Sequence, residues 1–192
     1  SSWNVYFGVT DVDAATTRFA GQTFVTQEDG GREIVAQQTV GGLSVVRKLA
    51  VPKSYFSRAL EILTNTTASP ITVGVTIVSR LGNLEFGRTS SGDTVFDVAG
   101  ATPDRWVVAR TSLQDGDVFL NTGGFGLALN FDGAGAPLRA STLTVGPISG
   151  ALSYGWPLTL APGETAALLH FTAPMYSNAA GEAAAARLDQ VP

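Results

Sequence analysis

The sequence has no cysteine and only one histidine among its 192 residues. The absence of cysteine excludes disulfide bonds, zinc–thiolate sites and cysteine nucleophiles. Charged residues make up 15% of the chain, whereas an average globular protein has about 25%. The formal net charge of −4 and the pI near 4.9 offer no basic surface for nucleic acid or an anionic membrane. No apolar run approaches the roughly 18 residues of a membrane-spanning helix, so we expect no membrane insertion.

The low charge, the 22 glycines and the absence of cysteine are together typical of an extracellular β module. The N-terminal residues lack the charged and then apolar segments of a signal peptide, so any targeting peptide would lie upstream or have been cleaved. We therefore interpret the chain as a domain of a larger protein and expect it to be extracellular or at the cell surface.

The clearest structural signal lies in the middle of the chain. From Ile71 to Ile77, branched apolar residues alternate with threonine and glycine, so one face of this segment is continuously apolar. The preceding segment, Asn65 to Pro70, is a cluster of turn-forming residues, and proline cannot donate to a sheet ladder. The pattern predicts a strand whose apolar face packs on a second layer, preceded by a turn.

Similar short runs recur along the chain between glycine-rich turn signals. The expected strands are 3–9, 22–27, 32–39, 43–51, 56–64, 71–80, 84–89, 94–98, 105–110, 126–131, 143–146, 152–160 and 165–173. This spacing, without intervening amphipathic helices, predicts an all-β fold, a large antiparallel β-sandwich over residues 1–176. Residues 177–192 are rich in alanine and predict a short helix near Ala179 to Leu188, either docked on the sandwich or linking it to a following domain.

Two sequence motifs indicate a relationship. The strand from Gly42 to Pro52, followed by the strand from Arg58 to Asn65, resembles those of the galactose-mutarotase-like β-supersandwich domains, in which this asparagine closes a turn. The strand pair around Pro162-Gly-Glu is similar to one that recurs in large bacterial secreted and surface proteins. The resemblance implies a supersandwich-like fold. Sugar epimerases of this fold need two histidines, or a histidine and a glutamate facing one another, and from the single histidine we expect no mutarotase activity.

His170 lies in an apolar predicted strand, and no nucleophile motif accompanies it. We expect it to be a hydrogen-bonded structural residue rather than a catalytic base. Asp115 and Asp117 flank a glycine and are the best candidates for calcium ligands, although aspartates in this setting are commonly turn formers. Apart from calcium, the sequence predicts no cofactor.

Tyr154 and Trp156 are the candidate binding residues. They lie two residues apart on a predicted strand and therefore share a face. If exposed, the two rings would form a platform for a sugar or a protein; if buried, they would form a packing layer. Large aromatic side chains are usually buried, so we expect these two rings to be buried, while the sequence leaves the exposed alternative open.

The leading hypothesis is a non-enzymatic extracellular β-sandwich module of a larger bacterial surface or secreted protein, serving adhesion, assembly, or carbohydrate or protein binding. One alternative is an accessory carbohydrate-binding or degenerate domain of a polysaccharide-active enzyme. Another is a self-assembling structural subunit, because exposed sheet edges can pair between copies. The expected partners are therefore a carbohydrate, a protein surface or further copies of the chain.

Overall fold

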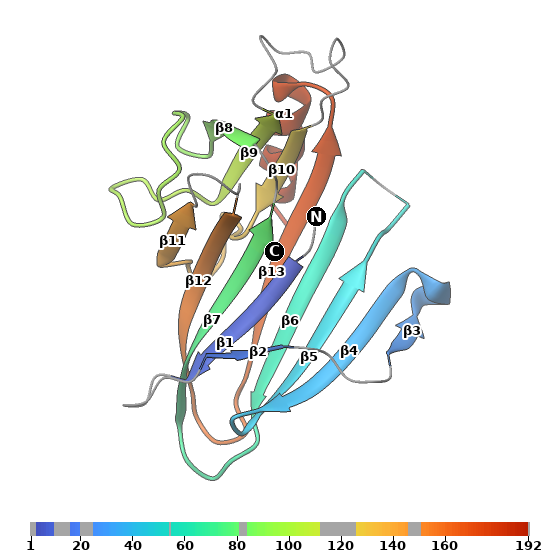
Figure 1. Cartoon of the computed structure of the whole chain (residues 1–192), viewed down its shortest axis with the longest axis vertical. Coiled ribbons are helices and arrows are strands. Elements are labelled where there is room, and N and C mark those ends of the chain that lie inside the picture. The colour runs from blue at the N-terminus through green and yellow to red at the C-terminus, as the bar shows by residue number, and fades with distance from the viewer. Residues whose placement is uncertain are drawn as a thin grey trace.

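The computed structural model describes residues 3–9, 16–19, 25–53, 55–80, 84–111, 126–145 and 151–191, and these form two packed antiparallel sheets (Figure 1). The five-stranded sheet has the order β11 (Thr142–Val145), β12 (Ala151–Leu160), β7 (Ile71–Arg80), β1 (Trp3–Val9) and β2 (Thr16–Arg18). The eight-stranded sheet has the order β3 (Thr26–Glu28), β4 (Glu33–Val40), β5 (Leu43–Ala50), β6 (Ser57–Asn65), β13 (Thr165–Met175), β10 (Gly126–Asn130), β9 (Trp106–Thr111) and β8 (Leu84–Thr89). The predicted all-β antiparallel sandwich is confirmed.

One expected strand, 94–98, is wrong, because aspartate side chains bond the local backbone there. Asp93 Oδ1 accepts from Val95 N at 2.9 Å, and Asp97 Oδ1 accepts from Ala99 N at 2.8 Å. The buried Asp104 Oδ2 accepts from Asp97 N at 3.0 Å. These bonds give the backbone partners that a sheet ladder would otherwise supply, so the segment forms an irregular loop between β8 and β9.

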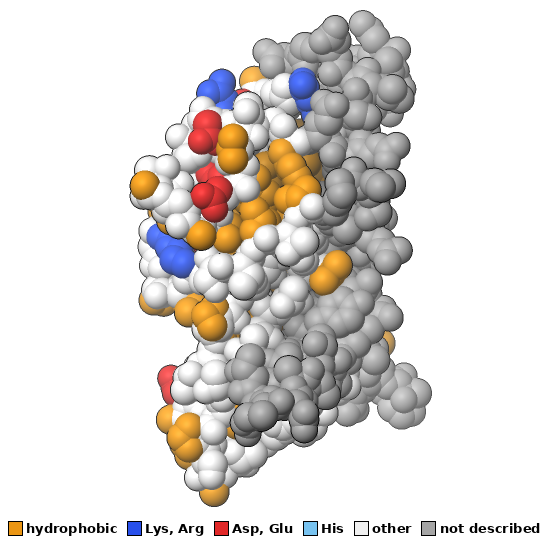
Figure 2. Space-filling view, turned by 60° about the vertical axis from the view of Figure 1, so that its left-hand side comes forward, with side chains coloured by type: hydrophobic (Ala, Val, Ile, Leu, Met, Phe, Trp, Pro, Cys, Tyr) orange, Lys and Arg blue, Asp and Glu red, His pale blue; other side chains and the backbone are white. Residues whose placement is uncertain are grey.

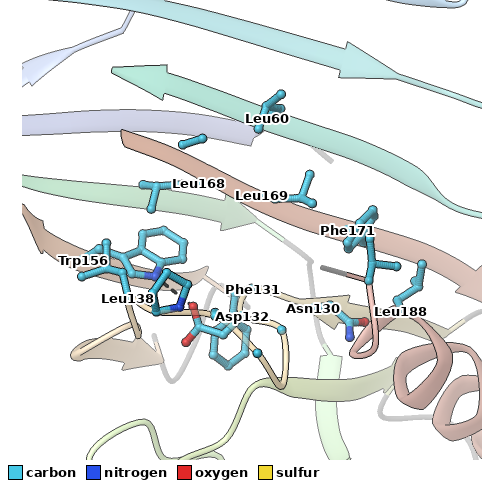
Figure 3. A pocket seen from close by; sticks show the side chains of 16 residues that line it. Leu60, Asn130, Phe131, Asp132, Leu138, Trp156, Leu168, Leu169, Phe171 and Leu188 are labelled. Atoms are coloured by element: carbon cyan, nitrogen blue, oxygen red, sulfur yellow. Dashed lines mark hydrogen bonds between the residues drawn. The ribbon is translucent and has the colours of Figure 1, made fainter. Parts of the chain in front are cut away.

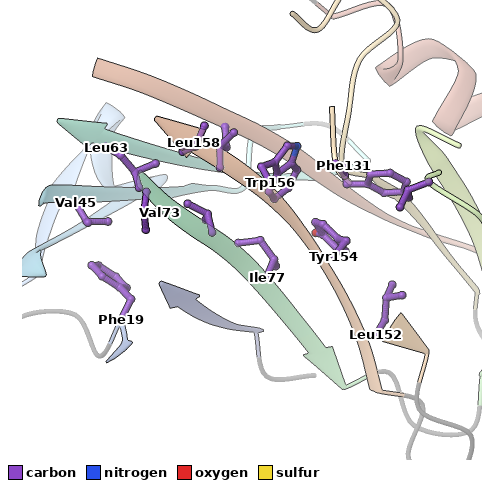
Figure 4. Close-up of a cluster of buried hydrophobic side chains, with 14 of the residues drawn as sticks. Phe19, Val45, Leu63, Val73, Ile77, Phe131, Leu152, Tyr154, Trp156 and Leu158 are labelled. Carbon is purple, nitrogen blue, oxygen red and sulfur yellow. The ribbon is translucent and has the colours of Figure 1, made fainter. Parts of the chain in front are cut away.

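The alternating segment forms β7, and its apolar side chains enter the core as predicted. Val73, Val75 and Ile77 are at most 1% exposed. Opposite Val75 and Ile77 in the ladder stand Trp156 and Tyr154 of β12, which point to the same side (Figure 4). This row of aromatic and branched side chains meets the inner face of the eight-stranded sheet and forms the main hydrophobic core.

Asn65 links two of the connections by which the chain crosses between the sheets, from β6 to β7 and from β12 to β13. Its Nδ2 donates to Ser69 O at 2.8 Å and to Leu160 O at 2.9 Å, and its Oδ1 accepts from Thr67 N at 2.9 Å. Its backbone N–H donates to Glu164 O at 3.0 Å. The turn-closing asparagine expected from the family resemblance is therefore also a bridge to the Pro-Gly-Glu turn.

Helix α1 (Asn178–Leu188) packs on the outer face of the eight-stranded sheet over β9, β10 and β13. Ser177 caps its N-terminus by accepting from Ala180 N at 3.2 Å. Gly181 permits the close approach, because a Cβ at this position would lie 2.9 Å from Val108 Cγ1. The Ala-rich segment is thus helical and docked. None of the helices in the described part of the chain is long and apolar enough to cross a membrane.

The core face of β7 leads to a first prediction. Ile77→Ala should lower the free energy of unfolding by about 2–5 kcal/mol, because it removes buried methyl groups and leaves a cavity between the sheets. Thr72→Ala, on the exposed face of the same strand, is the matched control and should change it by less than about 0.5 kcal/mol. Urea unfolding measures both, and equal effects would show that the register of β7 is wrong.

The Asn65 bridge leads to a second prediction. Asn65→Asp should lower the free energy of unfolding by more than about 3 kcal/mol at neutral pH, since it deprives two carbonyls of their donor and sets a carboxylate against them. Gln37→Glu is the control, because it makes the same amide-to-carboxylate change at an exposed position of β4 and should leave stability almost unchanged. A free energy of unfolding for Asn65→Asp equal to that of the wild type would show that the bridge does not stabilise the fold.

Candidate functional site

A cluster of ionisable side chains lies on the inner face of the eight-stranded sheet. Arg47 of β5 stands opposite Glu61 of β6 in the ladder, and His170 of β13 stands opposite Ala59, two residues from Glu61 on β6. The two-residue period of a strand places these side chains on the face that also carries the core residues Val45 and Leu63. The strands therefore bring together three polar groups that are distant in the sequence.

The contacts within the cluster are short. Arg47 Nε lies 3.0 Å from Glu61 Oε1, and His170 Nε2 lies 3.5 Å from the same oxygen. The hydroxyl of Tyr154, across the core on β12, lies 3.4 Å from His170 Nδ1. The Glu61 side chain is 0% exposed, so its charge is balanced within the protein by Arg47 rather than by water.

Burial raises the pKa of Tyr154, so its hydroxyl stays protonated and can donate to His170. His170 Nδ1 faces this hydroxyl, and its Nε2 faces Glu61. Tyr154 and His170 therefore form a hydrogen-bonded pair, and His170 and Arg47 both lie within ion-pair distance of Glu61. The sequence argument from a single histidine missed this pairing, because it did not anticipate that Glu61 would face His170.

Access to this cluster is limited. A cavity of about 200 Å³ at the β5–β6 end of the inner face is bordered by Arg47 and His170, together with aliphatic residues such as Leu49 and Val51. Glu61 does not border this cavity. Its volume is below the range of roughly 300–1,000 Å³ that is usual for small-molecule sites. The one carboxylate of the cluster is therefore sealed behind its partners.

The structure buries both predicted binding residues. Tyr154 and Trp156 are each 2% exposed, and their rings meet edge to face with centroids 5.4 Å apart. Trp156 Nε1 donates to Asp132 Oδ1 at 2.9 Å. The expected burial of the two rings is confirmed, and they form a packing layer instead of a surface platform for a ligand, because the same-face pair points between the sheets.

A second cavity, of about 340 Å³, opens where β10 ends and the following loop crosses toward β11 (Figure 3). Leu60, Leu169 and Phe171 supply an apolar wall, and Leu188 of α1 also borders the space. Its polar wall includes Asn130 and Asp132. Desolvation by burial raises the pKa of Asp132, although hydrogen bonds from Ala140 N and Trp156 Nε1 oppose the rise.

The predicted calcium ligands, Asp115 and Asp117, lie outside the described residues, so that site stays a prediction. Within the described ranges, no group of three or more histidine, aspartate or glutamate side chains could hold a metal ion. Arg47, Glu61 and Asn130 were not identified from the sequence. The signal available in the sequence was the position of Arg47 and Glu61. Each occupies an inward-facing position of its strand, and the neighbouring residues that face inward are apolar.

No protein-family model matches this sequence, and no curated protein matches it. Among solved structures, a polysaccharide lyase shares the fold with a TM-score of 0.59 and 14% identity, over 95% of this chain and 27% of the lyase. An α-galactosidase from Geobacillus stearothermophilus matches with a TM-score of 0.52 and 11% identity, over 90% of this chain and 30% of the enzyme.

A third structure, a proposed aldose 1-epimerase from Klebsiella pneumoniae subsp. pneumoniae, matches with a TM-score of 0.50 and 13% identity. This match covers 81% of the present chain and 54% of the epimerase. The chain thus spans between about a quarter and a half of these three proteins. The similarities show a galactose-mutarotase-like β-sandwich fold, as the sequence motifs indicated.

The buried ion pair leads to a third prediction. Glu61→Gln should lower the free energy of unfolding by about 3–5 kcal/mol, because it leaves the Arg47 charge buried without a counter-ion. Glu28→Gln, which removes the carboxylate of an exposed pair with Lys48, should leave stability almost unchanged. The double variant Arg47→Met, Glu61→Leu should recover most of this lost stability, as measured by denaturant unfolding. If the stability losses of the two single substitutions simply add in the double variant, the pairing is contradicted.

Proposed function

We propose that the chain is a non-enzymatic β-sandwich module of a larger secreted or surface-displayed bacterial protein that acts on or binds carbohydrate. In this role the module contributes carbohydrate or protein contact and assembly rather than turnover. The observation that carries the proposal is the sealed state of Glu61, the only carboxylate of the Arg47–Glu61–His170 cluster. A general acid or base must come within hydrogen-bonding reach of the substrate, and this carboxylate has no exposed surface.

The comparisons support the carbohydrate context. The polysaccharide lyase and the α-galactosidase are much longer than this chain, and each contains this sandwich as about a quarter to a third of its length. A fold of this kind can therefore occur as one part of a multi-domain carbohydrate-active protein. Fold similarity alone does not transfer an activity, so the assignment depends on the site and not on these proteins.

The visible surface supports a contact role. In the described part of the face shown in Figure 2, hydrophobic side chains gather in one hollow, with acidic and basic side chains beside it. A contiguous apolar patch with a polar rim is a feature of surfaces that bind another protein or a ligand. In the alternative role, that of an accessory carbohydrate-binding domain, the same surface features contact a glycan instead of a protein.

A fourth prediction tests the absence of turnover. The purified chain should hydrolyse no glycoside or ester and interconvert no free-sugar anomers above the uncatalysed rate, because the carboxylate of the acid–base cluster among the described residues is closed to a substrate. The screen should include His170→Gln, with Glu28→Gln as a surface control. Turnover that is present in the wild type and in Glu28→Gln but lost in His170→Gln would overturn the non-enzymatic assignment.

A glycan array separates the two kinds of contact. Retention of defined glycans by the isolated chain would support the accessory carbohydrate-binding form of the proposal. Absence of retention, together with a monomeric mass in solution, would favour a protein-contact or adhesion role.

A further inference from the structure

The eight-stranded sheet is incomplete beside the cavity of about 340 Å³. Strand β10 pairs with β13 only as far as Asn130, which stands opposite Phe171, whereas β6 pairs with β13 as far as Thr165. Beyond Asn130 the chain leaves the ladder, and Asp132 N donates to Arg105 O instead. Among the described strands, the part of β13 from Thr165 to Leu169 therefore has a neighbour on one side only.

The hydrogen-bond pattern identifies which backbone groups lie at this open side. Asn65 N donates to Glu164 O at 3.0 Å, so the backbone of Glu164 is directed towards β6. In an antiparallel ladder, successive residues direct their N–H and C=O groups to opposite neighbours. The backbone groups of Leu168 therefore face β6, whereas those of Ala167 and Leu169 face the space that β10 leaves.

No described residue bonds the backbone of Ala167 or Leu169 from this side. The loop of residues 133–138 borders the same cavity, but its polar groups are used elsewhere, since Ala134 N donates to Asp189 O at 2.8 Å. Ala167 is exposed and Leu169 is half-buried, and both border the cavity. The cavity thus gives access to a strand edge that has free donors and acceptors.

The cavity lies in the plane of the sheet, at the position that a further strand would take. Its lining includes Leu169 and Phe171, which belong to the cluster on the outer face, and Leu168 and Trp156, which belong to the core between the sheets. A cavity on one face of a sheet would be lined by alternate residues of β13 only. This cavity instead has apolar side chains on both sides of the open edge (Figure 3).

The corresponding edge of the other sheet is blocked. Strand β11 pairs with β12 as far as Gly155, whose C=O accepts from Ser141 N at 2.9 Å. The next residue of β12 that faces this side is Pro157, which has no N–H to donate. Proline and charged residues are common means of protecting a sheet edge. Strand β13 has neither from Thr165 to Leu169, so its edge is left able to pair.

We propose that an extended peptide segment of a partner protein adds to the eight-stranded sheet at this edge, in line with β10. Its backbone exchanges hydrogen bonds with Ala167 and Leu169, and its uncharged side chains alternate between the two apolar sides of the cavity. A peptide fits better than a sugar, because a backbone repeats a donor and an acceptor at the two-residue spacing of the open groups. At roughly 3.4 Å per residue, the edge accommodates about five residues.

This inference rests on the protein-contact form of the proposed function and identifies the edge that makes the contact. The turnover screen and the glycan array do not involve this edge. The peptide experiment can therefore fail while the proposed function stands, and turnover in the screen would leave a positive peptide result unchanged.

Hydrogen exchange of the free chain tests whether the edge is open. The amides of Ala167 and Leu169 should exchange at least about tenfold faster than those of Ala166 and Leu168, which donate to β6. Equal protection of the four amides would overturn the proposal, because the edge would then be covered already, by the chain itself or by a second copy. The mass in solution separates these two cases.

An NMR titration with the peptide acetyl-TVTVT-amide tests the occupant. Binding should shift the amide resonances of Ala167 and Leu169 downfield and slow their exchange. Two N-methylated forms, one modified at both valines and one at the three threonines, are matched controls. Only one of them loses the N–H groups that face β13, so that form should bind at least about tenfold more weakly, while the other binds like the parent peptide. Equal binding of the two forms, or no change at these amides with the parent peptide, would overturn the proposal.

Two proline substitutions locate the edge. Ala167→Pro removes an open N–H in the way that Pro157 does on β12, and it should leave a folded chain that binds the peptide at least about tenfold more weakly. Ala166→Pro removes a ladder bond to β6 instead and should lower the urea midpoint. Thr72→Ala should bind the peptide like the wild type. Wild-type affinity in Ala167→Pro would contradict the proposal, and the exchange and N-methylation results decide the matter even if this variant fails to fold.

Discussion

The arrangement of the two sheets depends on the hydrogen bonds of one buried amide. The chain passes between the sheets at the β6–β7 and β12–β13 connections, and Asn65 holds both through its side chain and its backbone. An amide is suited to this position because it donates twice and accepts at the same time, whereas an aspartate carboxylate can only accept and a leucine side chain can do neither. With the two crossings fixed, the registers of β6 against β13 and of β7 against β12 follow, and the inner faces meet with their apolar rows aligned.

The buried Arg47–Glu61 pair has a different role in the same core. Removing two charges from water is costly, and their attraction does little more than offset that cost. A pair of this kind adds little net stability but penalises any slip between β5 and β6, because a slip of either strand by one residue would turn its charge to the other face of the sheet and leave the partner charge buried alone. His170 and Tyr154 extend this constraint to β13 and, across the core, to β12. The cluster therefore relates strands of both sheets to one another.

The sequence was sufficient to predict the strands whose side chains alternate, and β7 is the clearest example, because a two-residue period reports directly on which face is buried. Sequence reasoning failed at 94–98, where Asp93 and Asp97 bond their own backbone and the apolar residues between them suggest a strand. It also missed the position of Glu61 beside His170 and the buried side-chain oxygen of Asn130 that has no hydrogen-bond donor among the described residues. These features depend on which strands become neighbours and on how α1 docks, and local periodicity carries no information on either.

The two cavities show how one sandwich separates two kinds of chemistry. The inner cluster has acid, base and counter-ion within contact distance, but its carboxylate is closed to solvent, so its charges are used within the fold. The cavity beside α1 lies apart from that cluster and has a mostly apolar lining. A site that binds without transforming needs only the second set of properties. That division supports the proposal that the chain serves as a binding and assembly module.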